Sequence, residues 1–157
     1  MADINAAIKK FNANGGMIFF GTSSGDKILN VVPGSLKVKP GGRRNIFYKD
    51  AGVVKTPLVG DEEYTMVSFR VRQADRTGSS GPWEKAQTAH TTGTPWSTTI
   101  TIRVPDSPGA STGEEWAITN CFVDEQPEAE MGGEGDAMDE IQLAFRSTQT
   151  TVVGTTY

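Results

Sequence analysis

The stretch from Tyr64 to Arg72 alternates more regularly than any other part of the chain and points to the class of fold. One face is formed by Thr65, Val67, Phe69 and Val71. The other face carries Tyr64, Met66, Ser68, Arg70 and Arg72. A period of two residues is typical of a β-strand with one buried face. The arginines at the end predict that the outer face of this strand is solvated or forms an interface.

Other short apolar runs, each bounded by turn residues, predict further strands. They cover residues 17–21, 28–32, 35–39, 96–104, 115–124 and 138–148. Two short helices are expected over residues 4–13 and 82–90, where Asp3 and Ser80 stand near the N-terminal caps. We expect one domain over residues 1–157 that is mainly β, either a β-sandwich or a partly closed β-barrel. Residues 149–157 form a flexible tail or a peripheral strand in this scheme.

Residues 39–61 are predicted to form a long projecting loop. This stretch mixes glycine, proline and cations with Ile46, Phe47, Tyr48, Val53 and Val54. A loop of this length in a compact domain is usually functional or disordered, and the aromatic and β-branched residues argue against disorder. Two interpretations are open. One is an exposed loop with a short hairpin, and the other is a projecting hairpin that becomes ordered against a neighbouring subunit.

Two opposed blocks of charge lie behind the net charge of −4. Residues 37–55 hold six cations against the single Asp50, and residues 124–140 hold eight carboxylates without a Lys or Arg. The cations are Lys37, Lys39, Arg43, Arg44, Lys49 and Lys55. The carboxylates are Asp124, Glu125, Glu128, Glu130, Glu134, Asp136, Asp139 and Glu140. Such blocks can pair within the fold or between copies of the chain, and the second case describes a building block.

Catalytic and cofactor motifs are scarce. The single His90 and the single Cys121 cannot supply the ligands of a zinc site, and no phosphate-binding or dinucleotide-binding glycine motif is present. The acidic block lacks the ligand spacing of a calcium loop, and its glycines work against the fixed geometry that a glycosidase needs. We therefore expect no enzyme, no cofactor and no metal. The structural alternative for the acids is a solvated acidic hairpin.

The sequence also bears on the compartment. The longest apolar stretch, 17–20, is far too short to cross a bilayer, and the acidic start Met1-Ala2-Asp3 does not read as a signal peptide. One cysteine excludes an intramolecular disulfide and fits a reducing compartment. Cys121 is expected to be a small buried hydrophobe. No membrane association is expected.

The order of these segments resembles the major tail tube proteins of long-tailed bacteriophages, whose fold is related to the tube proteins of contractile injection systems. Residues 17–21 and 31–34 resemble the opening strands of these tail tube proteins, and residues 40–60 resemble their long inter-ring loop. The stretch 60–63 leads into the strand 64–72, and the late strand pair resembles 116–130 and 139–146. The resemblance covers most of the chain and rests on layout, size and composition.

The resemblance implies a virion structural protein that forms hexameric rings, stacked head to tail around a tape measure protein and closed by a tail terminator. DNA would pass through a negatively lined tube without specific binding. Lys37, Lys39, Arg43, Arg44, Lys49 and Lys55, with Asp61, Glu62 and Glu63, are then candidates for contacts between rings. The carboxylates of 124–140 are candidates for the lumen wall or an acidic receiving patch. The protein would lie in the virion tail after assembly in the host cytoplasm.

Two alternatives belong to other classes. One is a different virion β-domain protein, such as a capsid decoration or tail terminator subunit. The other is a carbohydrate-binding β-sandwich that uses Trp83, Trp96 and Trp116 as sugar platforms, although Trp116 alternates with Ile118 and is expected in the core.

Overall fold

The computed structural model describes residues 11–21, 26–28, 31–72, 84, 87, 97–131 and 140–157. The described residues are mainly β, which confirms the predicted class. The first strands are β1 (Met17–Phe20), β2 (Asp26–Ile28), β3 (Lys37–Lys39), β4 (Gly42–Ile46), β5 (Lys49–Asp50), β6 (Val53–Val54) and β7 (Leu58–Glu63). They are followed by β8 (Thr65–Arg72), β9 (Ser97–Pro105), β10 (Gly113–Val123), β11 (Glu128–Glu130), β12 (Glu140–Ser147) and β13 (Thr155–Thr156). Among these residues, no helix has the length and apolar character needed to cross a membrane.

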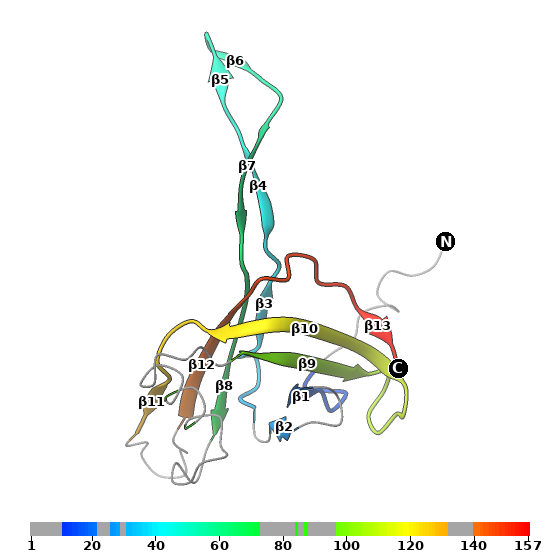
Figure 1. The fold of residues 1–157 in the computed structure, drawn as a ribbon. Coiled ribbons are helices and arrows are strands. Elements are labelled where there is room, and N and C mark those ends of the chain that lie inside the picture. Colours follow the sequence, from blue (N-terminus) through cyan, green and yellow to red (C-terminus); the bar gives the residue numbers. More distant parts are fainter. Residues whose placement is uncertain are drawn as a thin grey trace, which may run out of the picture.

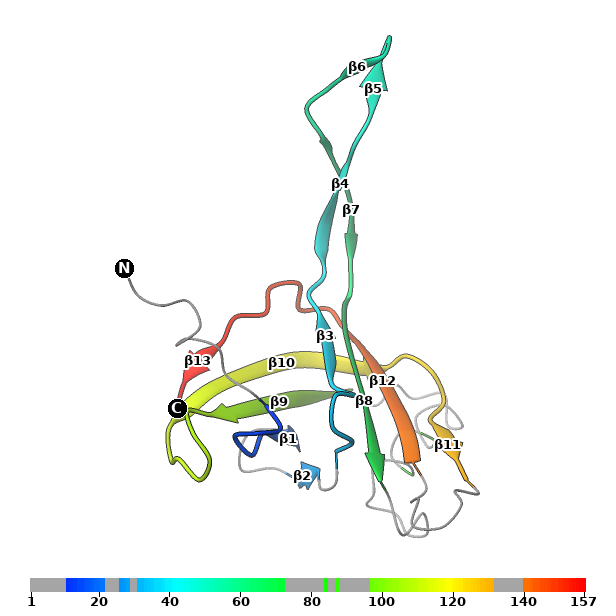
Figure 2. The ribbon, with the colours of Figure 1, turned by 180° about the vertical axis from the view of Figure 1, so that it is seen from behind.

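Nine of the strands form one antiparallel sheet in the order β2-β1-β9-β10-β12-β8-β3, with β11 beside β12 and β13 beside β10. In Figures 1 and 2, β9 and β10 run across the direction of β8 and β12, so the sheet is strongly bent. The two halves face each other as in a β-sandwich, and the sheet does not close into a barrel. The remaining strands, β4 to β7, form a narrow arm that leaves the sheet.

The core lies between the two halves of the bent sheet. Alternate residues of five strands are buried in one cluster: Ile18 and Phe20, Val67, Phe69 and Val71, Ile100 and Ile102, Ile118 and Cys121, and Ile141, Leu143 and Phe145. The rings of Phe20, Phe69 and Phe145 contact one another with centroids 5.8 to 6.4 Å apart. The alternation predicted for 64–72 is confirmed, because the odd-numbered residues of β8 are buried and the even-numbered ones are partly or fully exposed. Burial of Cys121 is confirmed too, and Trp116 packs against the core.

A local irregularity in β10 is repaired by the segment that follows β12. The register between β9 and β10 shifts between Ile118 and Cys121, and Asn120 adopts a positive φ of 51°. The side-chain oxygen of Gln149 accepts hydrogen bonds from the backbone N–H and the hydroxyl of Thr119, at 3.0 and 2.8 Å. The Ser147 hydroxyl donates to the Thr119 carbonyl at 2.5 Å. Backbone groups that leave the ladder thus regain partners.

The chain end belongs to the sheet. Thr155 and Thr156 pair with β10 as β13, and the backbone N–H of Tyr157 donates to the carbonyl of Gly113 at 3.1 Å. Of the two possibilities for 149–157, the structure therefore has the peripheral strand.

Two sequence expectations differ from the structure, and a third agrees with it at the described residues. The strand predicted over 28–32 lies earlier, at β2, because Val31 bridges Val71 and Val32 donates to the Arg70 carbonyl, which ties this stretch to β8. Residues 11–15 form turns, so the first predicted helix does not reach Ala13, and 4–10 lie outside the described residues. In the second predicted helix the described residues, Glu84 and Gln87, are helical.

The phenylalanine cluster gives a prediction about stability. Phe69→Ala removes a fully buried ring and should lower the free energy of unfolding by about 3–5 kcal/mol, measured by urea unfolding of the free subunit. Phe47→Ala is the matched control, since that ring is 78% exposed and its loss should change stability by less than about 0.5 kcal/mol. Equal losses in the two variants would contradict the assignment of the core.

Candidate assembly interface

The most prominent feature of the molecule is the arm, which we define as residues 41–64. Its two sides are β4 and β7, paired from Gly42 opposite Glu63 to Ile46 opposite Leu58. At the far end, β5 and β6 pair across a two-residue turn, Ala51-Gly52, in which both residues have positive φ, 48° and 78°. Such a turn matches the twist of a β-hairpin. Residues 39–61 are therefore not an irregular loop, since most of them are strand-paired.

The root of the arm is fixed to the sheet by hydrogen bonds. The backbone N–H of Gly41 donates to the buried hydroxyl of Thr65 at 2.9 Å, and that hydroxyl donates to the Gln149 carbonyl at 2.5 Å. A Cβ on Gly41 would collide with the backbone carbonyl of Glu63, and Gly42 has a φ of 104°. Gly41 thus lets the strands approach closely where the chain leaves β3, and Gly42 provides the backbone turn there. We call this contact the root clamp.

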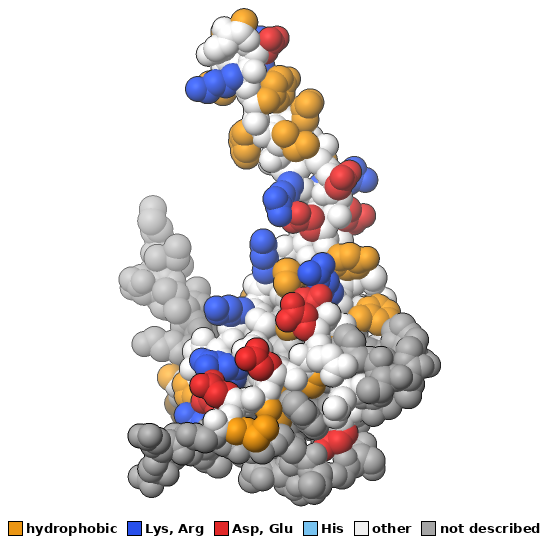
Figure 3. Space-filling model, turned by 90° about the vertical axis from the view of Figure 1, so that its left-hand side faces the viewer, with side chains coloured by type: hydrophobic (Ala, Val, Ile, Leu, Met, Phe, Trp, Pro, Cys, Tyr) orange, Lys and Arg blue, Asp and Glu red, His pale blue; other side chains and the backbone are white. Residues whose placement is uncertain are grey.

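Charged side chains gather at the base of the arm, and Figure 3 shows them below a more apolar upper half. Arg44 pairs with Glu63 at 2.7 Å, and Arg43 stands opposite Glu62 in the register. Both members of the Arg44–Glu63 pair are largely exposed, so the pair contributes little to stability, about 0–1 kcal/mol. The candidates Arg43, Arg44, Asp61, Glu62 and Glu63 thus lie together in one copy.

The upper half of the arm exposes a set of large apolar side chains that we call the tip patch. Phe47 is 78% exposed and Val54 is 75% exposed. The tip patch consists of Ile46, Phe47, Tyr48, Val53, Val54, Leu58 and Val59. Lys49 and Lys55 lie among them and are exposed. Most of these residues stand out in the sequence, but the predicted contact between rings falls on the cations and on the acids of 61–63. A period-two pattern does not reveal that both faces of a hairpin lack a core.

The structure divides the acidic block. Asp124 pairs with Arg146 at 2.6 Å. Glu140 pairs with Arg70 at 3.1 Å and with Arg72 at 4.0 Å. Glu125, Glu128 and Glu130 are exposed. Glu134, Asp136 and Asp139 lie outside the described residues, as do His90, Trp83 and Trp96.

Two short strands at opposite ends of one sheet layer carry opposite charge. Within the described strands, β3 pairs only with β8, and β11 pairs only with β12. β3 reads Lys-Val-Lys and β11 reads Glu-Ala-Glu, each with exposed charged residues around a half-buried centre. Lys37 and Lys39 thus lie at one edge of the layer β3-β8-β12-β11, and Glu128 and Glu130 lie at the other. Sequence analysis missed this juxtaposition, because it depends on the strand order.

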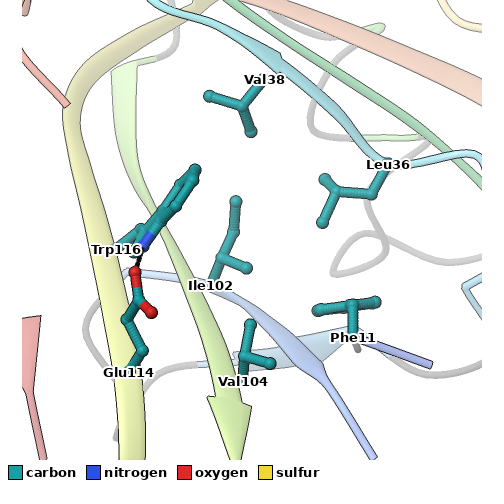
Figure 4. Close-up of a pocket in the computed structure, with 7 residues that line it drawn as sticks. All are labelled: Phe11, Leu36, Val38, Ile102, Val104, Glu114 and Trp116. Atoms are coloured by element: carbon teal, nitrogen blue, oxygen red, sulfur yellow. Dashed lines mark hydrogen bonds between the residues drawn. The ribbon is translucent and has the colours of Figure 1, made fainter. Parts of the chain in front are cut away.

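A half-open apolar cavity of about 370 Å³ lies between β3 and the strands β9 and β10. Figure 4 shows its lining side chains pointing toward one another, with the Trp116 indole N–H donating to a Glu114 carboxylate oxygen. The lining consists of Phe11, Leu36, Val38, Ile102, Val104, Glu114 and Trp116. We call this cavity the socket.

The described residues hold no group of three or more His, Cys, Asp or Glu side chains arranged to bind a metal ion. Burial raises the pKa of the Cys121 thiol to about 11, against an ordinary value of 9.0. A thiol that stays protonated at neutral pH is a poor nucleophile.

Comparison with known proteins identifies the fold. No protein-family model matches the chain, and no curated protein matches it in sequence. Among solved structures, it is similar to a chain of the sheath–tube complex of an extracellular contractile injection system, PVC, with a TM-score of 0.60 and 11% identity over 100% of both chains.

Two further structures extend the comparison. The anti-feeding prophage cap, a tube-terminating cap, gives a TM-score of 0.64 with 12% identity over 98% of this chain and 97% of the other. The PVC sheath/tube terminator gives 0.57 with 14% identity over 89% and 92%. The chain has the phage-tail-like tube fold, and the predicted resemblance is confirmed at the level of fold.

The shifted pKa of Cys121 gives a prediction about pH. Because the folded state binds the thiol proton more tightly than the unfolded state, this group's stabilising contribution is complete below pH 9 and declines as the pH rises toward about 11. We expect wild type to lose more stability between pH 8 and 10.5 than Cys121→Ala does, as measured by urea unfolding. Identical pH profiles would contradict the assignment.

Proposed function

We propose that this chain is the structural subunit of a tail-like tube. Copies join side by side into hexameric rings, and the rings stack head to tail. The observation that carries the proposal is the arm, whose tip patch exposes seven large apolar side chains on a segment fixed to the sheet by the root clamp. Soluble monomers rarely expose an apolar patch of this kind unless it binds a partner. The tube fold supports the same role.

The arm supports stacking because it projects away from the sheet. Gly42 and Ala51 lie nine positions apart in the sequence, which corresponds to about 30 Å at 3.4 Å per residue of extended strand. Fully burying one large apolar side chain gains about 1.5–3 kcal/mol, so docking of the tip patch on another copy would supply the main energy of stacking. The cations and acids at its base would then set orientation, as charges at interface rims do.

The two charged edges support lateral joining. Successive strands of the layer β3-β8-β12-β11 are antiparallel, and a layer of four such strands can repeat around a ring with every pair antiparallel. The β3 edge of one copy would pair with the β11 edge of the next. Lys37 and Lys39 would then face Glu128 and Glu130, and opposite charges across such a pair stabilise it by about 0.2–1 kcal/mol each.

The exposed face of β8 and β12 would form the wall of the conduit. Its arginines, Arg70, Arg72 and Arg146, are paired with Glu140 and Asp124 of the same copy. Phosphates bind to cations that can replace counterions, and paired arginines are less available for this. With Glu125 and the acids of 134–139 added, DNA would pass without specific binding. A tape measure protein and a tail terminator are the further proposed partners, in a tail particle assembled in the host cytoplasm.

A tail terminator is the second candidate, because two of the similar structures are a terminator and a terminating cap. The two roles differ in the number of rings that assemble. A tube subunit stacks without limit, and a terminator stops at one ring.

Electron microscopy of the purified protein tests the proposal. We expect long hollow tubes from wild type, and a variant with Phe47→Asp and Val54→Asp should remain folded but form no tubes, because two carboxylates would be buried in an apolar contact. The matched control carries Ser107→Asp and Ser111→Asp on the exposed β9–β10 turn and should still form tubes. Single rings from wild type would favour the terminator, and monomers at high concentration would contradict both roles.

A charge exchange tests the lateral edges. Lys37→Glu with Lys39→Glu should reduce ring formation at least tenfold, measured by analytical ultracentrifugation. Glu128→Lys with Glu130→Lys should do the same. Mixing the two double variants should rescue rings, since one variant has two acidic edges and the other has two basic edges, and alternating copies then meet with opposite charge at every contact of a six-membered ring. Combining all four changes in one chain should restore rings, and failure of that restoration would contradict the edge assignment.

A further inference from the structure

We infer that the socket between β3, β9 and β10 receives the arm tip of a second copy of this chain. The inference rests on the proposed stacking and specifies the surface that the arm binds. It starts from the apolar lining of the socket. Phe11, Leu36, Val38 and Trp116 are partly buried and pack against the core cluster, so the cavity is an opening into the core. Native interiors are densely packed, which makes an apolar opening of about 370 Å³ among the described residues a place for an apolar side chain.

The arm of the same copy cannot reach the socket. Leu36 and Val38 precede the arm directly along the chain, and the tip lies about 30 Å further on at 3.4 Å per residue of extended strand. Figures 1 and 2 show the arm extended away from β9 and β10. The root clamp holds Gly41 to Thr65 and Thr65 to Gln149, so the hairpin is fixed where it leaves the sheet. An arm tip that enters the socket must therefore come from another copy.

The tip patch has the shape and chemistry that the socket requires. Lys49 stands opposite Val54 in the register, so their side chains share a face, and Phe47 lies two residues before Lys49 in the segment that joins β4 to β5. Phe47 and Val54 are the two most exposed apolar residues of the arm, at 78% and 75%. A cavity of about 300 Å³ or more accommodates groups of this size. The knob is thus two apolar side chains with one ammonium group between them.

The charges are complementary. Six of the seven residues that line the socket are apolar, and the seventh is Glu114. The indole N–H of Trp116 donates to one oxygen of the Glu114 carboxylate and holds it at the wall. An ammonium group entering with Phe47 and Val54 would meet that carboxylate. The Lys49–Glu114 pair would fix which face of the hairpin enters the socket.

Knob and socket are different surfaces of one chain, which makes the contact heterologous. A contact of this type leaves one free knob and one free socket at each stage of assembly, and it propagates as an open stack when its geometry does not close into a ring. It supplies the direction of stacking that the proposed tube needs, because every arm must point the same way along the stack.

Cysteine cross-linking tests the contact in the full-length chain. A variant with Phe47→Cys and Val38→Cys should, after oxidation, give a ladder of covalent multimers on non-reducing gels. Cys121 is buried and its pKa is raised to about 11, so it stays outside the reaction. The matched control pairs Phe47→Cys with Ser111→Cys, which lies on an exposed turn, and should remain at least tenfold less cross-linked.

A charge exchange gives an independent readout. Lys49→Glu or Glu114→Lys alone should lower the amount of tube at least tenfold, and the two changes in one chain should restore it. Tubes that form in the cysteine variant without cross-linking, together with single charge variants that assemble like wild type, would overturn the socket and leave the tube proposal standing. Failure of wild type to form tubes or rings would overturn the tube proposal and the socket with it.

Discussion

The whole arrangement depends on the root clamp, a hydroxyl shared between two backbone groups. Thr65 accepts from the Gly41 N–H and donates to the Gln149 carbonyl, which joins the arm, β8 and the C-terminal segment at one buried point. Gln149 also supplies the partners that the irregular part of β10 lacks. Without this node a two-stranded arm would be free to swing, because an isolated hairpin is marginally stable in water. The node turns the arm into an extension of the sheet.

Sequence patterns anticipated the parts of the fold that bury one face. The alternation in 64–72 became β8, and the late apolar runs became β9, β10 and β12, because burial of one face imposes a period of two. The same reasoning misplaced the second strand. In the sequence, Val31 and Val32 look like a continuation of that strand. In the structure they pair with residues 70 and 71 of β8, which are distant in the sequence. A local apolar pattern does not predict which strand of the sheet an apolar residue will contact.

The candidate site shows the same division. Clusters of charge are visible in sequence, and they drew attention to 37–55 and 124–140. The strand register decides which charged residues form ion pairs within one copy. Arg44 with Glu63 and Asp124 with Arg146 are examples. The socket could not be predicted either, because Phe11, Val38 and Trp116 meet only when the sheet bends. The tip patch could be predicted in part, because its aromatic and β-branched residues are visible in the sequence and indicate that 39–61 is not a disordered loop.

The two charged edges have a consequence for what the chain cannot form. An exposed strand edge is open to pairing with any other edge, including its own copy, and natural proteins use charge to prevent this. Two β3 edges would bring four lysines together, and two β11 edges would bring four glutamates together. Symmetric dimers through either edge are therefore penalised, and such dimers would be dead ends. The charges of Lys-Val-Lys and Glu-Ala-Glu therefore act by exclusion, because they disfavour the pairing of each edge with the same edge of another copy.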